Sequence, residues 1–267
     1  MRILICLLLF SLVTSLTSCN RKIKGKDTDL IWADEFNGHE PPNSAKWGFD
    51  IGTGDWGWGN NELQYYTNRP ENVRLLNGKL VIEAHKEDYE GSKYTSGRVV
   101  TRNKASWVHK RIAIRAKLAS GRGTWSAIWM LGDKVEEVGW PLGGEIDIME
   151  HVGHAPDTLF GTVHTKAFNH MLGTEDGGNT TAKDLETNFH IYSIDWHEDR
   201  IEFKLDGNTY HTFHKRDNAT DEEWPFDEPH YLLMNLAVGG MWGSVKGVDE
   251  DIWPRRMEID WVRVYKL

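Results

Sequence analysis

Cysteine is nearly absent from this chain, because Cys6 and Cys19 are its only two and both lie near the N-terminus. The rest of the chain therefore has no disulfide and no thiolate metal site, and its stability must come from a packed core. The apolar run at residues 3–13 is shorter than the roughly 20 residues of a membrane-spanning helix. We find no repeat of about 20–50 residues and no long amphipathic helical pattern, which excludes solenoids and helical bundles.

Positive charge is also in deficit, with 31 Lys and Arg against 40 Asp and Glu and a formal net charge of -9. Such a protein repels nucleic acid and acidic membrane surfaces, so we expect a neutral partner and no nucleic acid. In contrast, the 267 residues include 13 Trp and 26 Gly. This combination indicates a single turn-rich domain in which some aromatic rings are exposed for contact.

The N-terminus has the pattern of an export signal, since Arg2 precedes the apolar run. The residues LTSC at 16–19 are similar to a bacterial lipobox, in which the cysteine becomes the lipidated first residue. Ordinary cleavage after small residues is the alternative. We expect a lipoprotein signal peptide at 1–18, a polar tether at 19–29 beginning with lipidated Cys19, and one domain at 30–267. This predicts an exported bacterial lipoprotein of the outer membrane or cell surface, or a secreted or periplasmic protein if the lipobox is not used.

From residue 30 onward the pattern is that of an all-β protein. Polar and apolar residues alternate in several segments, as expected of antiparallel strands with one buried face. The dipeptide Asp206-Gly207 separates two such segments and predicts a hairpin turn. Many strands joined by glycine-rich loops indicate a two-sheet sandwich. The segments are LVIEAHK (80–86), RIAIRAKL (111–118), FHIYSIDW (189–196), RIEFKLDGNTYHTF (200–213), HYLLMNLAV (230–238) and MEIDWVRVY (257–265).

Two aromatic segments are candidates for ligand contact. In GTWSAIWML (123–131), a period of two places Trp125, Ala127 and Trp129 on one face of a strand. Two indoles on an exposed face would form a platform for sugar rings, whereas the same indoles could also belong to the core. The segment GTGDWGWGNNELQYYT (52–67) is too polar for a core strand. It is either a recognition loop at the rim of a cleft or an ordinary packed surface loop.

The hexapeptide EIDIME at residues 145–150 carries three acids within a strand-like frame. Alternation places Glu145 and Asp147 on one face and Glu150 on the other. A β-bulge at Ile148-Met149 would return Glu150 to the face of the other two acids. Two glutamates on one face suit a retaining glycosidase, whose carboxyl groups lie about 5–5.5 Å apart. The alternative is a solvated acidic edge strand, in which three carboxylates repel one another unless one holds a proton.

The hexapeptide and its flanks, GGEIDIMEHVG, resemble the signature of family 16 glycoside hydrolases. They have its bulged E-x-D-x-x-E form, not the E-x-D-x-E form of bacterial lichenases. Other segments resemble the laminarinase branch of that family, in order along the chain. They are WADEFNG (32–38), GWGNNELQYYT (57–67), SGRVVTRNK (96–104), GTWSAIWMLG (123–132), VHTKAFNH (163–170), WPFDEPHYLLMNLAVGGMWG (224–243) and MEIDWVRVY (257–265).

The resemblance implies a concanavalin A-like β-jelly-roll sandwich with a substrate cleft on its concave sheet. It implies endo-hydrolysis of β-1,3-glucan with retention of anomeric configuration, mixed-linkage β-1,3/1,4-glucan as a further substrate, and no cofactor for catalysis. By position, Glu145 would be the nucleophile, Glu150 the general acid that later acts as base, and Asp147 the assistant between them. Glu150 must then hold a proton near neutral pH, which requires a raised pKa.

The resemblance also implies substrate contacts. Trp125 and Trp129 match stacking residues, and His164 matches a histidine beside the acid/base, although a histidine satisfied within the core is the alternative. Three further residues match positions that line the cleft or bind sugar hydroxyls, namely Arg98, Asn60 and Trp242.

A structural calcium is implied as well, through Glu35, the carbonyl of Gly78 and Asp260. Oxygen ligands suit calcium. The alternative is that these are ordinary strand-end acids without a metal.

The chain departs from the laminarinase pattern at two positions. Ser126 stands where proline is usual, and we expect that change to be mild on an edge strand. Met241 stands where asparagine is usual, which removes a polar group near the cleft. Two other readings remain open, a hydrolase of sulfated algal galactan such as carrageenan and a non-catalytic surface glycan-binding lipoprotein. We find no oligomerisation signal and expect a monomer that meets the membrane only through its lipid.

Overall fold

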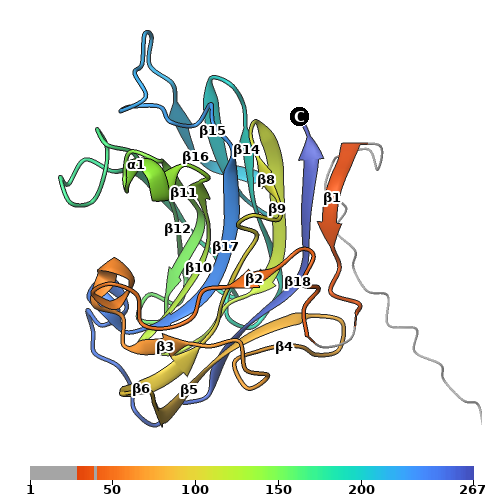
Figure 1. Ribbon diagram of the computed structural model, residues 1–267, viewed down its shortest axis with the longest axis vertical. Coiled ribbons are helices and arrows are strands. Elements are labelled where there is room, and N and C mark those ends of the chain that lie inside the picture. The colour runs from red at the N-terminus through yellow and green to blue at the C-terminus, as the bar shows by residue number, and fades with distance from the viewer. Residues whose placement is uncertain (1–28, 39–40) are drawn as a thin grey trace, which may run out of the picture.

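The computed structural model describes residues 29–38 and 41–267 (Figure 1). The predicted signal peptide, Cys19 and almost all of the tether lie outside the described residues. Among the described residues, no helix is long and apolar enough to cross a membrane.

Two mostly antiparallel sheets form the body of the molecule and curve in the same direction (Figure 1). Within the described residues the first sheet has ten strands, with β1 and β4 added to β18 and β5 beside the path β16-β15-β14-β9-β18-β5-β6-β3. These strands are β1 (Leu30–Asp34), β3 (Gln64–Tyr66), β4 (Val73–Leu75), β5 (Leu80–Tyr89), β6 (Ser92–Ser96), β9 (Lys110–Lys117), β14 (His190–Trp196), β15 (Arg200–Leu205), β16 (Asn208–His214) and β18 (Arg255–Lys266).

The second sheet has eight described strands in the order β13-β12-β11-β10-β17-β7-β2, with β8 paired to β17. They are β2 (Gly48–Phe49), β7 (Arg98–Val100), β8 (Ser106–Trp107), β10 (Thr124–Gly132), β11 (Glu145–Val152), β12 (Thr158–His164), β13 (Asp176–Thr181) and β17 (His230–Val238). Three short helical segments lie in loops, namely η2 (Gly57–Asn61), α1 (Val135–Val138) and α2 (Gly240–Gly243). The predicted two-sheet sandwich is confirmed.

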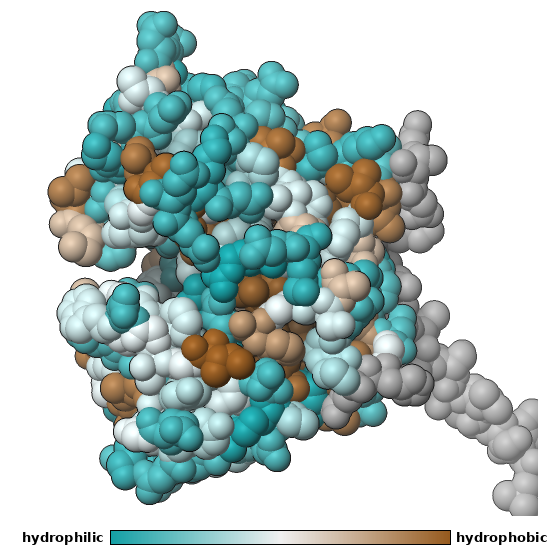
Figure 2. Space-filling model, viewed as in Figure 1, coloured by the Kyte–Doolittle hydropathy of each residue, from teal (hydrophilic) through white to brown (hydrophobic). Residues whose placement is uncertain are grey.

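The core lies between the sheets and explains the alternation in the sequence. Ile112, Ile114 and Ala116 of β9 are fully buried in the main hydrophobic cluster, together with Ile128 and Met130 of β10. The side chains of the second sheet that alternate with these face away from the core, and they form the surface on which the candidate site lies. Figure 2 shows a notch in the molecular surface on this side, between the parts that carry α1 and η2 in Figure 1.

Two local predictions have opposite outcomes. The Asp206-Gly207 hairpin is confirmed, because β15 and β16 flank it and both residues have positive φ, 51° and 82°. The edge-strand expectation for Ser126 is wrong. Strand β10 pairs with β11 on one side and β17 on the other, and Ser126 is fully buried, because β10 forms the middle of the second sheet.

Candidate active site

A β-bulge interrupts β11 at the predicted position. Against β10, Asp147 pairs with Trp129 and Met149 pairs with Ile128, so Ile148 is the additional residue. The same shift appears against β12, because two residues of β11 and only one of β12 lie between the pairs Asp147–Thr162 and Glu150–Phe160. The side chains of Ile148 and Met149 are both buried in the main hydrophobic cluster. The predicted bulge at Ile148-Met149 is confirmed.

The bulge places the three acids on one face. Partners directly across an antiparallel pair share a face, and Asp147 lies opposite Trp129 while Glu150 lies opposite Ala127. Because Ala127 and Trp129 are two residues apart on β10, they point the same way. Glu145, opposite Leu131, follows the same alternation. The expectation that Trp125, Ala127 and Trp129 share a face is therefore consistent with the register, and this face also carries all three acids.

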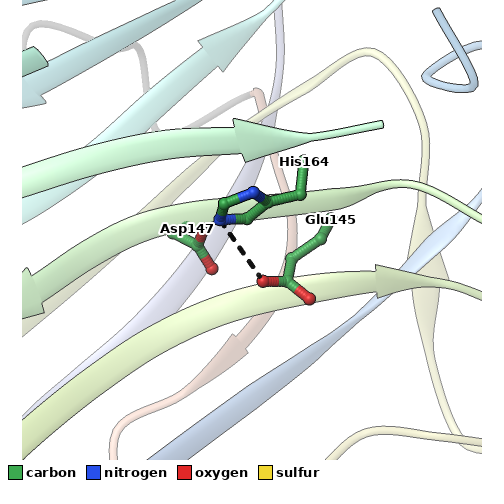
Figure 3. A group of neighbouring side chains, drawn as sticks. All are labelled: Glu145, Asp147 and His164. Carbon is green, nitrogen blue, oxygen red and sulfur yellow. Dashed lines mark ion pairs between the residues drawn. The ribbon is translucent and has the colours of Figure 1, made fainter. Parts of the chain in front are cut away.

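His164 closes the acidic group from the neighbouring strand β12. Its Nε2 lies 3.3 Å from Oδ2 of Asp147 and 3.9 Å from Oε1 of Glu145. Figure 3 shows the imidazole reaching over both carboxylates. Asp147 is only 3% exposed and His164 only 7%. Since Glu145 pairs with His164 in the strand register, the sheet itself brings the imidazole to the acids.

Two indoles donate hydrogen bonds to the glutamates. Trp125 Nε1 donates to Oε1 of Glu150 over 3.1 Å, and Trp140 Nε1 donates to Oε2 of Glu145 over 2.9 Å. Trp140 belongs to the loop between α1 and β11, is 38% exposed, and its ring packs against His170. Trp140 is a site residue that was not predicted from the sequence. The available signal was an aromatic residue close before the acidic strand.

Burial and crowding raise the pKa of all three carboxyl groups. Burial, followed by the negative charge of Asp147, raises the pKa of Glu145 to about 8. Burial also raises the pKa of Asp147 to about 8, although its hydrogen bond with Glu145 acts in the other direction. The pKa of Glu150 is raised well above its usual value by burial and then by Asp147 and Glu145. His164 and the indole donors lower the pKa of the glutamates. The group thus retains protons near neutral pH.

Three aromatic side chains form a cluster beside Glu150. Trp242 of α2 contacts Trp125 with ring centroids 5.7 Å apart and Phe160 at 4.8 Å, both edge to face. Phe160 lies opposite Glu150 in the β11–β12 register. The structure therefore brings the predicted residues Trp125 and Trp242 together. Phe160 is an addition that only the strand pairing reveals.

Arg98 and Asn60 contact protein groups in this structure. Arg98 is 7% exposed, its Nε lies 3.0 Å from Oδ2 of Asp50, and its guanidinium lies 4.8 Å from the ring centroid of Trp129. Asn60, in η2, hydrogen-bonds the carboxylate of Glu62. Arg98 is therefore held from within the protein, whereas Asn60 is half-buried and is held by Glu62.

The residues predicted to bind calcium already have partners. Both carboxylate oxygens of Glu35 accept hydrogen bonds from Arg263 over 2.8 Å, and Asp260 pairs with Arg115. Gly78 lies near the side chain of Asn37, two residues after Glu35. Two carboxylates neutralised by arginines do not fit a carboxylate-bound calcium. Of the described residues, two groups have metal-ligand spacing, and neither contains Glu35 or Asp260.

Comparisons with known proteins agree with this geometry. Residues 55–263 match the family described as glycosyl hydrolases family 16. The chain is 49% identical over 260 residues to a β-glucanase of Rhodothermus marinus, covering 94% of this chain and 90% of that protein.

Solved structures extend the similarity to three dimensions. The laminarinase from Rhodothermus marinus has a TM-score of 0.86 at 50% identity, covering 89% of this chain and 97% of that chain. SCLam, a non-specific endo-β-1,3(4)-glucanase co-crystallised as a mutant with 1,3-β-D-cellotriosyl-glucose, has a TM-score of 0.85 at 47% identity, covering 89% and 94%. These matches confirm the expected β-jelly-roll sandwich. The chain belongs to glycosyl hydrolases family 16 and is a glycoside hydrolase.

Proposed function

We propose that this protein is a retaining endo-β-1,3-glucanase that also accepts mixed-linkage β-1,3/1,4-glucan. The observation that carries the proposal is the bulge in β11, which puts Glu145 and Glu150 on one face. The bulge leaves them about four strand positions apart, roughly 13 Å along the backbone, a gap that two glutamate side chains on one face can narrow by leaning together. The charge of Glu145 contributes to the raised pKa of Glu150, in keeping with a close pair.

In the first step, Glu145 is the nucleophile. Its ionised carboxylate forms a bond to the anomeric carbon while the bond to the leaving oxygen breaks, and Glu150 gives its proton to that oxygen. The raised pKa of Glu150, caused by burial and by the charges of Asp147 and Glu145, suits a group that must hold a proton for the leaving oxygen. Trp140 and His164 favour the ionised form of Glu145.

In the second step, Glu150 activates water. Esterification removes the negative charge of Glu145, which lowers the pKa of Glu150 and lets it accept the proton of the attacking water. The oxygen of that water bonds to the anomeric carbon as the ester bond to Glu145 breaks. The hydrogen bond with Glu145 lowers the pKa of Asp147, and the negative charge of Asp147 raises the pKa of both glutamates. We therefore assign Asp147 the role of controlling the ionisation of its two neighbours.

The substrate class follows from the relatives and from the charges of the cleft. The named relatives act on β-glucans, and SCLam is a non-specific endo-β-1,3(4)-glucanase. The two arginines near the cleft, Arg98 and Arg102, both pair with Asp50. Compensated arginines suit a neutral polysaccharide, because binding sulfate groups would require breaking these ion pairs.

The experiment is to measure reducing-end release from laminarin, lichenan and carrageenan by the wild type and Glu145→Gln. We expect release from laminarin and lichenan by the wild type, none from carrageenan, and almost none from the variant. Product sizes followed over time on a linear 1,3-glucan test the endo mode, for which oligosaccharides of intermediate length appear first. Glucose alone from the start rejects it.

The two other readings have their own outcomes in this experiment. Release from carrageenan alone supports the sulfated-galactan reading. Binding of laminarin without release from any polymer supports the non-catalytic binder. The bulge argues against a non-catalytic binder. Binding sugars does not need a protonated glutamate beside an ionised one, whereas hydrolysis does.

The predictions for the N-terminus stay part of the proposal. We propose that Cys19 is lipidated and anchors the exported, monomeric domain to the outer membrane or cell surface. The support is the sequence LTSC after an apolar run. Labelling with a radioactive fatty acid in the wild type but not in Cys19→Ala is expected, and equal labelling rejects the anchor. A single species with the mass of one chain in sedimentation of the detergent-free domain tests the monomer.

For calcium, we propose binding at Asp260 only in competition with Arg115, because that guanidinium already neutralises the carboxylate. Melting temperature is measured with calcium and with chelator in the wild type and in Arg115→Gln. We expect a larger calcium-dependent rise in the variant, because the competing cation is gone. No calcium-dependent change in either protein rejects the site.

A further inference from the structure

Glu62, which lies outside the catalytic strand β11, accepts several hydrogen bonds from neighbouring side chains. Glu62 directly follows η2, and its Oε2 accepts hydrogen bonds from Gln64 Nε2 over 2.6 Å and from Tyr66 OH over 3.0 Å. Gln64 and Tyr66 are both fully buried. The side chain of Asn60 provides a further hydrogen bond to the same carboxylate. The mechanism above gives Glu62 no role.

The first path to Glu62 begins at Trp129, and its direction is fixed. An indole N–H can only donate, and Trp129 Nε1 donates to Oδ1 of Asn235 over 2.8 Å. Asn235 must therefore turn its Nδ2 toward the hydroxyl of Tyr66, 3.0 Å away. Because that hydroxyl accepts from Asn235, its own proton is directed to Glu62.

The second path begins at the backbone N–H of Val238, which is also a donor only. It donates to Oε1 of Gln64 over 2.7 Å, so Gln64 must turn its Nε2 toward Glu62. The two paths thus end on the same oxygen, and this oxygen must accept twice. An ionised carboxylate meets that demand, whereas a protonated Oε2 would face two donors. Burial raises the pKa of Glu62, while these donors and the charge of Arg98 lower it.

We propose that Glu62 is a positioning residue that acts through Tyr66 and Asn235 to hold the indole of Trp129 in place for a sugar ring. Arg98 restrains the same indole from its face, with the guanidinium 4.8 Å from the ring centroid. The proposal rests on the proposed function, in which Trp129 serves as a sugar platform. Loss of the path frees the indole to rotate and weakens sugar binding, while Glu145 and Glu150 keep their contacts.

The first test is Tyr66→Phe, which keeps the ring and removes the link. We expect KM for linear 1,3-glucan oligosaccharides to rise about three- to tenfold, the effect of one lost hydrogen bond, with kcat within about twofold. Glu62→Gln keeps an oxygen that accepts from Tyr66, so its KM should lie nearer the wild type than that of Glu62→Leu. The matched control is Tyr65→Phe, whose ring packs against Tyr89. Its KM should not change.

The decisive test is a double-mutant cycle with Trp129→Ala. If Tyr66 acts through the indole, Tyr66→Phe raises KM in the wild-type background and changes nothing further in the Trp129→Ala background. Multiplicative effects of the two changes, or a fall in kcat with unchanged KM, overturn the proposal.

Calorimetric binding of the same oligosaccharide to Glu145→Gln, with and without Tyr66→Phe, separates this inference from the proposed function. A wild type that hydrolyses no 1,3-glucan overturns the proposed function, while the binding comparison still tests the hydrogen-bond path. Hydrolysis by the wild type together with equal affinity in the two variants overturns the path alone.

Discussion

The imidazole of His164 lies against Asp147, with Nε2 3.3 Å from Oδ2, and it belongs to a different strand from the acids. When charged, His164 lowers the pKa of Glu145. Removing it in His164→Asn should raise the pKa of Glu145, so the acidic limb of the kcat/KM profile should move to higher pH. At pH 6 the loss should be about tenfold for each pKa unit. His211→Asn, which changes a histidine paired with Asp176 elsewhere, should leave the profile unchanged. If the acidic limb of His164→Asn does not move, His164 does not lower the pKa of Glu145.

Asp147→Asn should move the pH profile in the opposite direction. The negative charge of Asp147 contributes to the raised pKa of both Glu145 and Glu150. Its removal lowers both pKa values, so both limbs of the kcat/KM profile should shift to lower pH. We expect activity at the optimum to fall by about 10²-fold, typical of a group that assists proton transfer. Limbs that stay in place, or that move upward, would show that Asp147 does not control the ionisation of its neighbours.

Glu145→Gln should stabilise the fold, and more so at high pH. The folded pKa of about 8 exceeds the ordinary value of 4.5, so between these values the folded protein binds more protons than the unfolded chain. Stability from this group is therefore present below about pH 4.5 and is lost as pH rises through 8. A neutral glutamine avoids that loss, and we expect a gain of about 1–3 kcal/mol at pH 8.5.

The measurement is thermal unfolding at pH 5 and pH 8.5, where each kcal/mol corresponds to a rise of about 2–4 °C. The control is Glu198→Gln on the turn between β14 and β15, which is exposed and should show no such difference. Equal melting temperatures of Glu145→Gln and wild type at pH 8.5 would mean that burial of the ionised Glu145 does not destabilise the folded protein.

Much of the site was predictable because strand geometry constrains it. Alternation gave the wrong face for Glu150, and a bulge was the one local change that corrected it. Residues such as Trp140 and Phe160 were missed for a different reason. Trp140 reaches Glu145 from a loop, and Phe160 reaches Glu150 across a strand pair, and neither contact follows from local periodicity.

Arginine pairing is a feature of the structure that the sequence could not supply. Glu35 and Asp260 have the chemistry of calcium ligands, yet each contacts an arginine that lies far away in the sequence or on another strand. Arg98 lies buried beside Asp50, and its contact with sugar hydroxyls stays a prediction. A sequence shows which side chains can bind a metal or a sugar, but the partner that neutralises them is fixed by the three-dimensional pairing of strands.

The central claim is that Glu145 attacks the sugar and Glu150 transfers the proton. The most direct measurement is the anomeric configuration, by proton NMR, of the glycosyl azide that each alanine variant forms from an activated 1,3-glucan substrate in the presence of azide. Glu145→Ala should give the α-azide, because azide attacks in place of the missing nucleophile. Glu150→Ala should give the β-azide, because azide attacks the ester formed on Glu145. The reverse assignment, or the same anomer from both variants, would contradict the account.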